Sequence, residues 1–376
     1  MGMPRKKSKS PPIMSHEFVI QNHADIVSCT AIVIILGLLF EATAKISRLF
    51  VFLQYGLKQD EEVNEEDDEV IEKFPVDFNR GWLDAFTVIF QMLIVIVVHA
   101  VIQEYIIDKM SRKLHLSKTK TSKFNESGQL SMWSAVSAIW AGYCVHQSKL
   151  LPNVSALWEE YPHTVLRWEN KLFMLIQLAY WLHMFPELYL QKVRKEEIST
   201  RIQYYCLYFF FIFAAYFTNF WKLCIVTLAL HYPMECLFHV SRMLYFAEKD
   251  ENAQIGFRVW TFLYPVVRFL ILSLTVLVFW FGFGNLAEKG FDPASGNFNS
   301  GLIRTSAMAA MCLLQLWLMW RFIQLRFRRQ RDQKQAAQAL KKKSTPAKAK
   351  GGKSKQKKSI ESEEDNKVSN GKLKRS

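Results

Sequence analysis

LALHYPMECLFHVSRMLYF, residues 228–246, is the stretch that decides the fold. It is apolar enough to lie in a membrane, yet it carries His231, Glu235 and His239 at four-residue spacing. In an α-helix these positions share one face, about one turn apart. A charged side chain at the bilayer centre costs roughly 2.5 kcal/mol or more. We therefore expect this polar face to look into protein or a water-filled cavity rather than into lipid.

Apolar residues make up half of the 376-residue sequence and include 29 Phe, 11 Trp and 13 Tyr. They come in blocks of about twenty residues, so we expect an all-α, polytopic membrane helical bundle of about eight transmembrane helices. The expected spans are residues 26–53, 82–107, 130–145, 172–190, 202–217, 223–246, 257–283 and 302–322. The third and fifth are short and should borrow flanking residues. The first contains Glu41 and Lys45, which could neutralise each other at i,i+4 spacing.

Charge divides the chain into parts with different expected environments. These are a basic N-terminus (1–25), two transmembrane helices joined by an acidic loop (26–107), a six-helix membrane domain (124–325) and a basic tail (326–376). Lys and Arg gather before the first span and after the second, fourth and eighth, so both termini are predicted to be cytosolic and the acidic loop lumenal. The tail has few apolar residues and is expected to be disordered.

Short motifs outside the spans suggest modification and targeting. Asn153 begins an Asn-Val-Ser sequon on the predicted lumenal side, so we expect a glycan there. Asn125 also begins a sequon, but on the cytosolic side, where it should stay unmodified. Lys372 and Lys374 fit the dilysine pattern of endoplasmic-reticulum retrieval signals. The basic tail could also contact anionic lipid headgroups or ribosomal RNA through phosphates.

The polar face of residues 228–246 allows three interpretations. Two imidazoles and a carboxylate could bind zinc or iron. Ligands at i, i+4 and i+8 spread over about 12 Å, however, so one ion would need ligands from other helices. His231 and Glu235 could instead form an acid–base pair. The residues alone favour the third interpretation, hydrogen bonding between helices.

A second polar pair, His183 and Glu187, lies in the fourth expected span. Pro186 between them should kink the helix and free a backbone carbonyl. Together with the first face, this pair predicts an internal polar cavity. Arg242 and Arg268 could pair with a carboxylate or a lipid phosphate there. The sequence contains no recognisable catalytic, cofactor-binding or metal-binding motif, so we expect no catalytic residue, cofactor or metal.

The sequence resembles the translocating chain-associated membrane protein family over about residues 5–330. The stretches that carry the resemblance are KKSKSPPIMSHEFVIQNHADIVSC (6–29), HAVIQEYIIDK (99–109), SKTKTSKFNESGQLS (117–131), QLAYWLHMFPELYLQK (177–192) and the opening stretch. The resemblance implies a non-enzymatic endoplasmic-reticulum protein beside the Sec translocon channel. Its partners would be signal sequences and nascent transmembrane segments, whose translocation or insertion it assists.

Residues 124–325 also resemble a TLC domain, the membrane fold shared with ceramide synthases. Acyl-transferring members carry two adjacent histidines on one helix, and a His-Asp pair followed by a further Asp. Here His231 matches the histidine of the His-Asp pair, but Tyr232 follows it in place of the aspartate, and the later acid is Glu235.

The paired histidines have no counterpart either, because Tyr204-Tyr205 fall near their position. A tyrosine, with a pKa of about 10, is a poor base at neutral pH. The resemblance therefore implies the fold without the acyl transfer. The alternative function is lipid handling, as an acyl-CoA-dependent sphingolipid acyltransferase or as a lipid binder.

Overall fold

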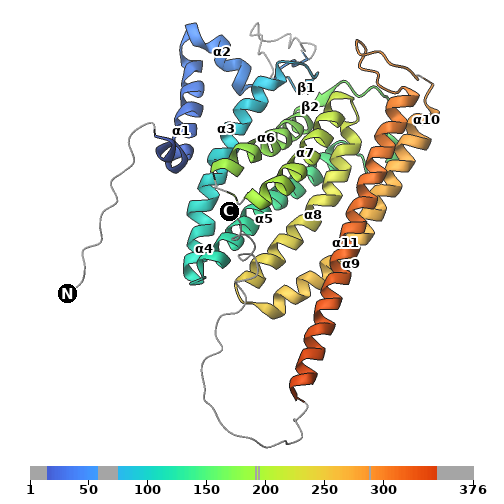
Figure 1. Ribbon diagram of the computed structural model, residues 1–376. Helices are drawn as coiled ribbons and strands as arrows, with labels where there is room; N and C mark the ends of the chain where they lie inside the picture. The colour runs from blue at the N-terminus through green and yellow to red at the C-terminus, as the bar shows by residue number, and fades with distance from the viewer. Residues whose placement is uncertain (1–14, 58–74, 191–192, 194, 288, 345–376) are drawn as a thin grey trace, which may run out of the picture. The chain divides into compact units, whose positions relative to one another are not determined.

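The computed structural model describes residues 15–57, 75–190, 193, 195–287 and 289–344, which are almost entirely helical (Figure 1). The helices are α1 His16–Leu36, α2 Glu41–Val51, α3 Asp84–Ile102, α4 Asp108–Lys113, α5 Lys118–Gln147, α6 Trp168–Leu190, α7 Lys195–Phe217, α8 Trp221–Phe246, α9 Asp250–Val276, α10 Phe283–Asn285 and α11 Gly301–Ser344. Two short strands, β1 Asp77–Phe78 and β2 Leu166–Arg167, pair antiparallel.

The polytopic helical bundle predicted from sequence is confirmed. Five helical stretches of the described chain are long and apolar enough to cross a membrane. They are His16–Leu39, Asp84–Lys113, Trp221–Phe246, Asp250–Asn285 and Gly301–Asp332. The short third and fifth predicted spans do borrow flanking residues, because α5 and α7 run to 30 and 23 residues. The described residues up to Met319 form one compact unit, and the described residues 320–344 belong to another.

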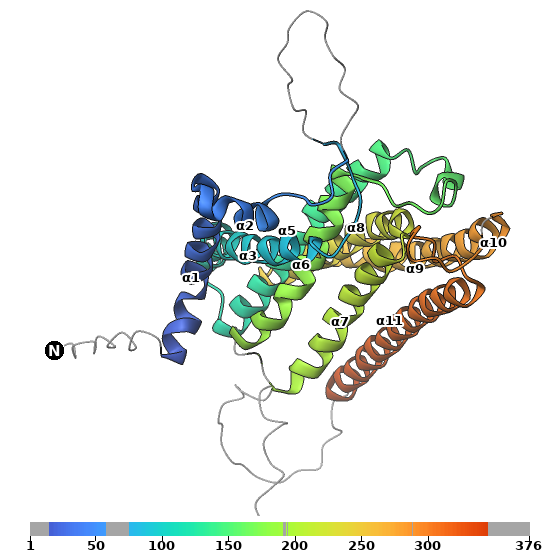
Figure 2. The same ribbon diagram turned by 90° about the horizontal axis from the view of Figure 1, so that it is seen from above.

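The central helices α5, α6 and α7 are less apolar than these five stretches, because neighbouring helices bury much of their surface. Viewed from above, α6 lies inside the first unit, with α1 at one end of the row and α9 at the other (Figure 2). It packs against α3, α5 and α7 and is buried on most of its surface. A helix shielded by its neighbours can carry polar groups that lipid would not tolerate.

Helices α5 and α8 pack closely because α5 presents small side chains. Ser127, Ser131 and Ser134 are buried, and their hydroxyls donate hydrogen bonds to backbone carbonyls of α5 itself. The Ser131 hydroxyl also lies 3.3 Å from the Met243 sulfur of α8. Small residues let two membrane helices approach closely, which fixes the position of the polar face on α8.

The first predicted span, residues 26–53, is wrong in one respect: it is not a single helix. The chain leaves the helical conformation at Phe40, and α2 runs in a different direction from α1 (Figure 1). Gly37 permits this bend, since a Cβ there would lie 2.2 Å from the Ser47 hydroxyl. Glu41 and Lys45 are therefore exposed on α2 and do not form a pair within a long membrane helix.

The expectation of disorder from residue 326 onward is also wrong for the first part of the tail. Helix α11 continues to Ser344. Residues 326–344 are rich in Arg, Gln, Lys and Ala, all good helix formers, so helix propensity outweighs the lack of an apolar stripe. The remaining tail, with the predicted retrieval residues Lys372 and Lys374, lies outside the described residues.

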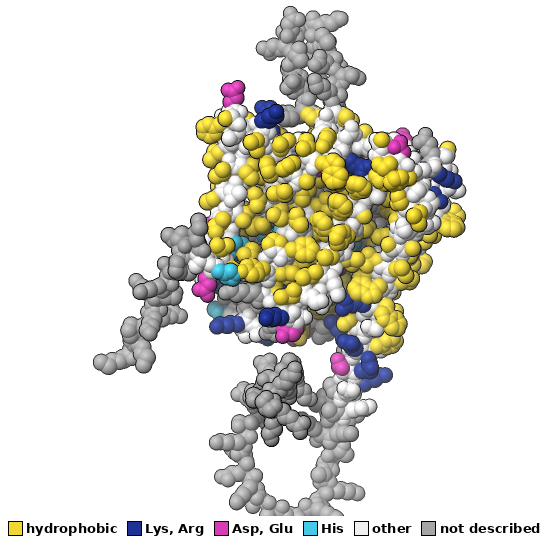
Figure 3. Space-filling view, turned by 45° about the horizontal axis from the view of Figure 1, so that its top comes forward, with side chains coloured by type: hydrophobic (Ala, Val, Ile, Leu, Met, Phe, Trp, Pro, Cys, Tyr) yellow, Lys and Arg dark blue, Asp and Glu magenta, His cyan; other side chains and the backbone are white. Residues whose placement is uncertain are grey.

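The surface agrees with a membrane environment. In the space-filling view one broad face is covered by hydrophobic side chains, and Lys, Arg, Asp and Glu gather at its margins (Figure 3). Exposed apolar side chains on this scale are unusual for a protein surrounded by water and are typical of a surface that contacts lipid.

Candidate functional site

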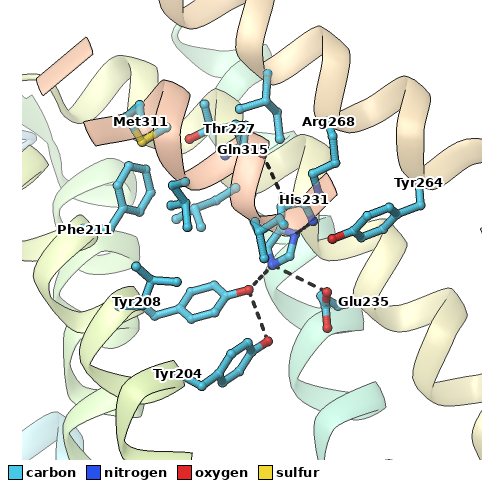
Figure 4. Close-up of a pocket in the computed structure, with 15 residues that line it drawn as sticks. Tyr204, Tyr208, Phe211, Thr227, His231, Glu235, Tyr264, Arg268, Met311 and Gln315 are labelled. Atoms are coloured by element: carbon cyan, nitrogen blue, oxygen red, sulfur yellow. Dashed lines mark hydrogen bonds and ion pairs between the residues drawn. The ribbon is translucent and has the colours of Figure 1, made fainter. Parts of the chain in front are cut away.

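A pocket opens within the helical bundle around His231. Four helices of the first unit form it: α7, α8, α9 and the first half of α11. Its lining residues are Tyr204, Leu207, Tyr208, Phe211, Thr227, Leu228, His231, Glu235, Tyr264, Arg268, Ile271, Met311, Leu314, Gln315 and Leu318. The empty space in and around it comes to about 600 Å³, including space open to solvent. Most of its walls are apolar, and its polar groups converge on His231 (Figure 4).

Two prolines loosen the helices that carry the polar groups. Pro233 lies inside α8, two residues after His231, and Pro265 lies inside α9, three residues before Arg268. Each proline removes one N–H from the helical hydrogen-bond ladder. The polar side chains of the pocket are therefore carried by helical segments that proline has already weakened.

His231 contacts three other polar side chains of the pocket. Arg268 Nη2 lies 2.6 Å from His231 Nδ1, and the Tyr208 hydroxyl is hydrogen-bonded to His231 Nε2. The Glu235 carboxylate is 3.8 Å from the same Nε2. The Tyr204 hydroxyl lies 3.2 Å from that of Tyr208 (Figure 4). His231 and Arg268 are both almost fully buried.

The arginine fixes the direction of these hydrogen bonds. A guanidinium can only donate, so His231 Nδ1 must accept from Arg268 and the imidazole proton must be on Nε2. His231 Nε2 then donates to the Tyr208 oxygen. The two tyrosine hydroxyls carry two protons but share one contact, so one O–H is left to point into the pocket. The polar end of the pocket therefore holds both an O–H donor and the Glu235 carboxylate, an acceptor that lines the same pocket.

The three residues of the opening stretch do lie on one face of α8. Glu235 stands between the two histidines, 3.8 Å from His231 Nε2 and 3.5 Å from His239 Nε2. Among the described residues, no group of three His, Cys, Asp or Glu side chains is arranged to hold a metal ion. Arg242 lies apart from the pocket, with its guanidinium over the rings of Phe238 and Phe246.

The second predicted polar pair does not join this pocket. Glu187 lies 3.8 Å from His99 of α3. His183 is fully buried, and its Nδ1 is 2.5 Å from the Tyr180 carbonyl oxygen. The His183 ring also packs edge-on against that of His99. The structure thus has two separate polar clusters where the sequence suggested one cavity.

A third cluster, at the start of α3 and α6, was not anticipated from the sequence. Lys171 Nζ is 2.7 Å from Asp84 Oδ1 and donates to the carbonyls of Gln54 and Asn79 at 2.7 and 2.6 Å. Asp84 Oδ2 accepts from Tyr216 at 2.8 Å. In the sequence, Asp84 and Lys171 only flank apolar runs, where charged residues normally face water. We name this set the lumenal cluster, following the predicted orientation.

The two sequons differ in accessibility. Asn153 is exposed between α5 and α6, and its side-chain oxygen accepts a 2.8 Å hydrogen bond from Ser155. Asn125 lies within α5 and donates to Asp108 at 3.1 Å. The accessible sequon is the one for which a glycan is predicted.

Only some positions of the acyltransferase motif line the pocket: His231, Glu235 and Tyr204 do, whereas Tyr205 and Tyr232 do not. Tyr204, near the expected position of the paired histidines, lines the pocket, whereas Tyr205 packs against Phe185. Tyr232, which stands in place of the motif's aspartate, is buried and donates to Gln177 at 2.5 Å. Tyr208, Tyr264 and Gln315 were missed from the sequence, because single polar residues in aromatic or apolar runs carry no distinctive spacing.

Comparison with known proteins shows which family has this arrangement. The family model for the TLC domain matches residues 123–324. The chain is 47% identical to translocating chain-associated membrane protein 2 of Homo sapiens over 319 residues, 85% of this chain and 83% of the relative. It is 45% identical to the protein of the same name from Mus musculus over the same shares. Sphingosine N-acyltransferase lac1 of Schizosaccharomyces pombe is 30% identical, but over only 32% of this chain and 33% of its own.

The relatives that align along most of the chain are named for a translocating chain and not for a reaction, whereas the acyltransferase aligns over a third. The resemblance seen in the sequence is confirmed: the chain belongs to the translocating chain-associated membrane protein family and contains a TLC domain.

Proposed function

We propose that the protein lies beside the Sec translocon channel of the endoplasmic reticulum. There it assists the translocation of secretory proteins and the insertion of signal sequences and transmembrane segments. The observation that carries this proposal is the 47% identity over 85% of the chain to a relative named for its association with a translocating chain. We propose no enzymatic activity, because tyrosines stand where the acyl-transfer chemistry would need histidines and an aspartate.

A physical mechanism follows from the polar groups in the membrane domain. The central helices are less apolar than the outer ones, and two clusters of ionisable side chains lie within the bundle, one between α3 and α6 and one between α8 and α9. Polar groups at membrane depth favour local thinning of the bilayer and entry of water. Such a perturbed bilayer would lower the free energy of moving a marginally hydrophobic segment from the channel into lipid.

Reconstitution would test this function. Proteoliposomes would contain the Sec channel with or without the protein, and two secretory precursors would differ only in the hydrophobicity of the signal sequence. We expect the protein to raise insertion of the weakly hydrophobic signal and leave the strongly hydrophobic one unchanged. Equal insertion of the weak signal in both preparations would contradict the proposal.

Photocrosslinking would test the proposed partners. A ribosome-stalled nascent chain with a photoreactive residue in its signal sequence should crosslink to the membrane domain. A photoreactive residue placed far from the signal should not. A pure assembly scaffold would instead associate with translocons and give no crosslinks from either position.

The remaining parts of the proposal concern topology and the tail. Both termini would be cytosolic, with a glycan at Asn153 and retrieval through Lys372 and Lys374. Endoglycosidase treatment should shift the protein on a gel, and Asn153→Gln should abolish the shift. A shift that persists in Asn153→Gln would contradict the proposed glycan at this residue.

Exposed arginines of the second unit support a contact with ribosomal RNA. Arg326, Arg328 and Arg331 lie on the part of α11 beyond Met319. Phosphate contacts weaken as salt displaces them. Co-sedimentation with ribosomes should therefore fall with salt and with the triple change of these arginines to Glu. Ribosome binding that is insensitive to salt and to the triple substitution would contradict this contact.

A further inference from the structure

Helix α1 presents a carboxylate to the outside of the bundle. Its buried and half-buried positions Ala24, Val27 and Ala31 recur every three or four residues and face α3, the long helix on which α1 packs. Asp25 lies on the opposite side of α1 and is exposed. Seen from above, α1 is the outermost helix at one end of the row (Figure 2). Among the described residues, no hydrogen bond or ion pair reaches the Asp25 carboxylate.

The level of Asp25 in the membrane follows from the position of α1 beside α6. The His16 ring, at the start of α1, packs edge-on against that of Tyr189, with the ring centroids 5.1 Å apart. Tyr189 is next to the last residue of α6, whose 23 residues are about 34 Å long and so just cross the bilayer. Asp25 follows His16 by about two and a half turns, or about 14 Å along the helix axis. It therefore lies near the middle of a hydrocarbon layer about 30 Å thick.

A carboxylate in this position needs a partner from outside the described bundle. Ionisable side chains of membrane helices almost always face the bundle interior or pair with one another. Lysine and arginine can extend to the interface, but the aspartate side chain is too short to cover this distance. Lipid headgroups stay at the interface, about 15 Å away. The missing partner is therefore a cation carried to this depth by another transmembrane helix.

The surface around Asp25 suits the approach of such a helix. Gln21 and Cys29 lie one turn before and one turn after Asp25 on the same exposed stripe. The short Cys29 side chain leaves room for a neighbouring backbone, and the Gln21 amide can donate and accept a hydrogen bond. Whenever this face is empty, the carboxylate faces lipid at a cost. A lasting partner removes this cost at all times, whereas a transient one does not.

From these observations we propose that the outer face of α1 docks a transmembrane helix of a constitutive partner protein. A lysine or arginine near the middle of that helix pairs with Asp25. This surface is separate from the pocket at His231, and the proposal does not depend on the role in protein insertion.

Thiol crosslinking of the purified full-length protein in phosphatidylcholine nanodiscs would test the pairing. The probe is a Leu-Ala transmembrane peptide, flanked by tryptophans, with one lysine at its middle and one cysteine a turn away. Cys29 is exposed one turn from Asp25, so a docked peptide should form a disulfide with it under mild oxidation. We expect severalfold more adduct than with a peptide that has leucine in place of the lysine. A peptide with the lysine moved to its end should behave like the leucine peptide.

Matched substitutions on α1 test the carboxylate itself. Asp25→Asn keeps the size of the side chain and should lower the adduct to the level of the leucine peptide, whereas Asp25→Glu should retain most of it. Glu17→Gln removes an exposed carboxylate near the start of the same helix and should have no effect. Cys29→Ser should abolish the adduct. All these positions are exposed, so the variants should fold.

Photocrosslinking in cell membranes would test whether the partner is constitutive. A photoreactive residue in place of Ile32, which is 53% exposed on the same outer face, should give one adduct. That adduct should persist when puromycin releases the nascent chains, and it should be lost in Asp25→Asn. An adduct that puromycin removes would assign this face to nascent chains and overturn the proposal.

Three results with the purified protein would also overturn the proposal. Equal adducts with the lysine and leucine peptides would show that the cation is not recognised. Equal effects of Asp25→Asn and Glu17→Gln would show that the depth of the carboxylate does not matter. A disulfide dimer through Cys29 that forms without peptide and requires Asp25 would assign the face to a second copy of the chain. Because no translocon is present in the nanodiscs, these outcomes do not bear on the proposed role in insertion.

Discussion

The lumenal cluster and the pocket both bury charged side chains in an apolar bundle, but they surround them differently. In the lumenal cluster, Lys171 is 0% exposed and has three oxygen partners within 2.7 Å, among them Asp84. In the pocket, Arg268 lies beside empty space and one of its N–H groups has no partner within the described residues.

This difference separates structural from functional use of a buried charge. A buried charged group whose hydrogen bonds are all made within the protein has no free donor for a ligand. Removing its partner leaves a buried charge without compensation. A charge beside space and spare donors has been left incomplete, at a cost in stability that a ligand can offset. The lumenal cluster should therefore govern stability, and the pocket should govern binding.

The largest effect on stability is expected at Lys171, and its absence would contradict this comparison. Lys171→Met should destabilise the protein by about 3–5 kcal/mol, because it leaves the Asp84 carboxylate and two carbonyl oxygens buried without their partner. The midpoint of denaturant unfolding in mild detergent, together with cellular abundance, would measure the loss. Lys149→Met, at an exposed position after α5, is the matched control. Equal unfolding midpoints for the two variants would show that the lumenal cluster is not structural.

A pH-dependent effect of intermediate size is expected at His163, in the loop between α5 and α6. Burial, with a smaller contribution from nearby Lys222, lowers the pKa of His163 to about 4. The unfolded chain would protonate this histidine at about 6.5. The stabilising contribution is thus complete above pH 6.5 and is lost as the pH falls toward 4, about 2 kcal/mol by pH 5.

Unfolding midpoints at pH 7 and pH 5 would measure this loss. His163→Gln removes the titrating group and should flatten the difference between the two pH values. If the variant and the parent protein lose the same stability between pH 7 and pH 5, other groups are responsible. The loop would then tolerate a charge on His163 without a charged partner, whereas the lumenal cluster pairs its buried charges.

The fold could be predicted from sequence because hydrocarbon imposes a strong constraint. Blocks of about twenty apolar residues predicted a helical membrane bundle. The break at Gly37–Phe40 was not predicted, because Glu41 and Lys45 were interpreted as a pair within one long span and the bend depends on the close approach of Gly37 to Ser47. The helical part of the tail was missed because expected disorder rested on composition, whereas helix formation rests on propensity.

The candidate site was predictable only in part, for a geometric reason. Spacing along one helix placed His231, Glu235 and His239 on a common face. It could not show that Arg268 reaches His231 from α9, or that Glu187 turns to His99 of α3 instead. Contacts between helices depend on packing and rotation about each helix axis, and a single sequence does not contain either.

Changing one tyrosine in the packed core and one in the pocket to Phe would compare the two environments through a smaller loss of stability. Tyr232→Phe, in the packed core, should cost about 1–3 kcal/mol because Gln177 loses its buried partner. Tyr208→Phe should cost less than about 1 kcal/mol, since the pocket leaves His231 room to turn toward Glu235. Unfolding midpoints in detergent would rank them, and a larger loss for Tyr208→Phe would mean that the pocket is part of the structural core.

The smallest effect is expected where a charge pair is neither buried nor next to a cavity. Lys120 Nζ lies 2.6 Å from Glu248 Oε1, and both side chains are exposed. The lysine lowers the pKa of Glu248, so any contribution to stability would be present above the usual carboxyl pKa and lost at lower pH. Water and salt screen such a pair, and holding two long side chains together costs entropy. Lys120→Gln should therefore leave the unfolding midpoint unchanged, both at pH 7 and at pH 4. A shift as large as that of Tyr232→Phe would mean that distance alone, and not burial, decides what a charge pair contributes in this protein.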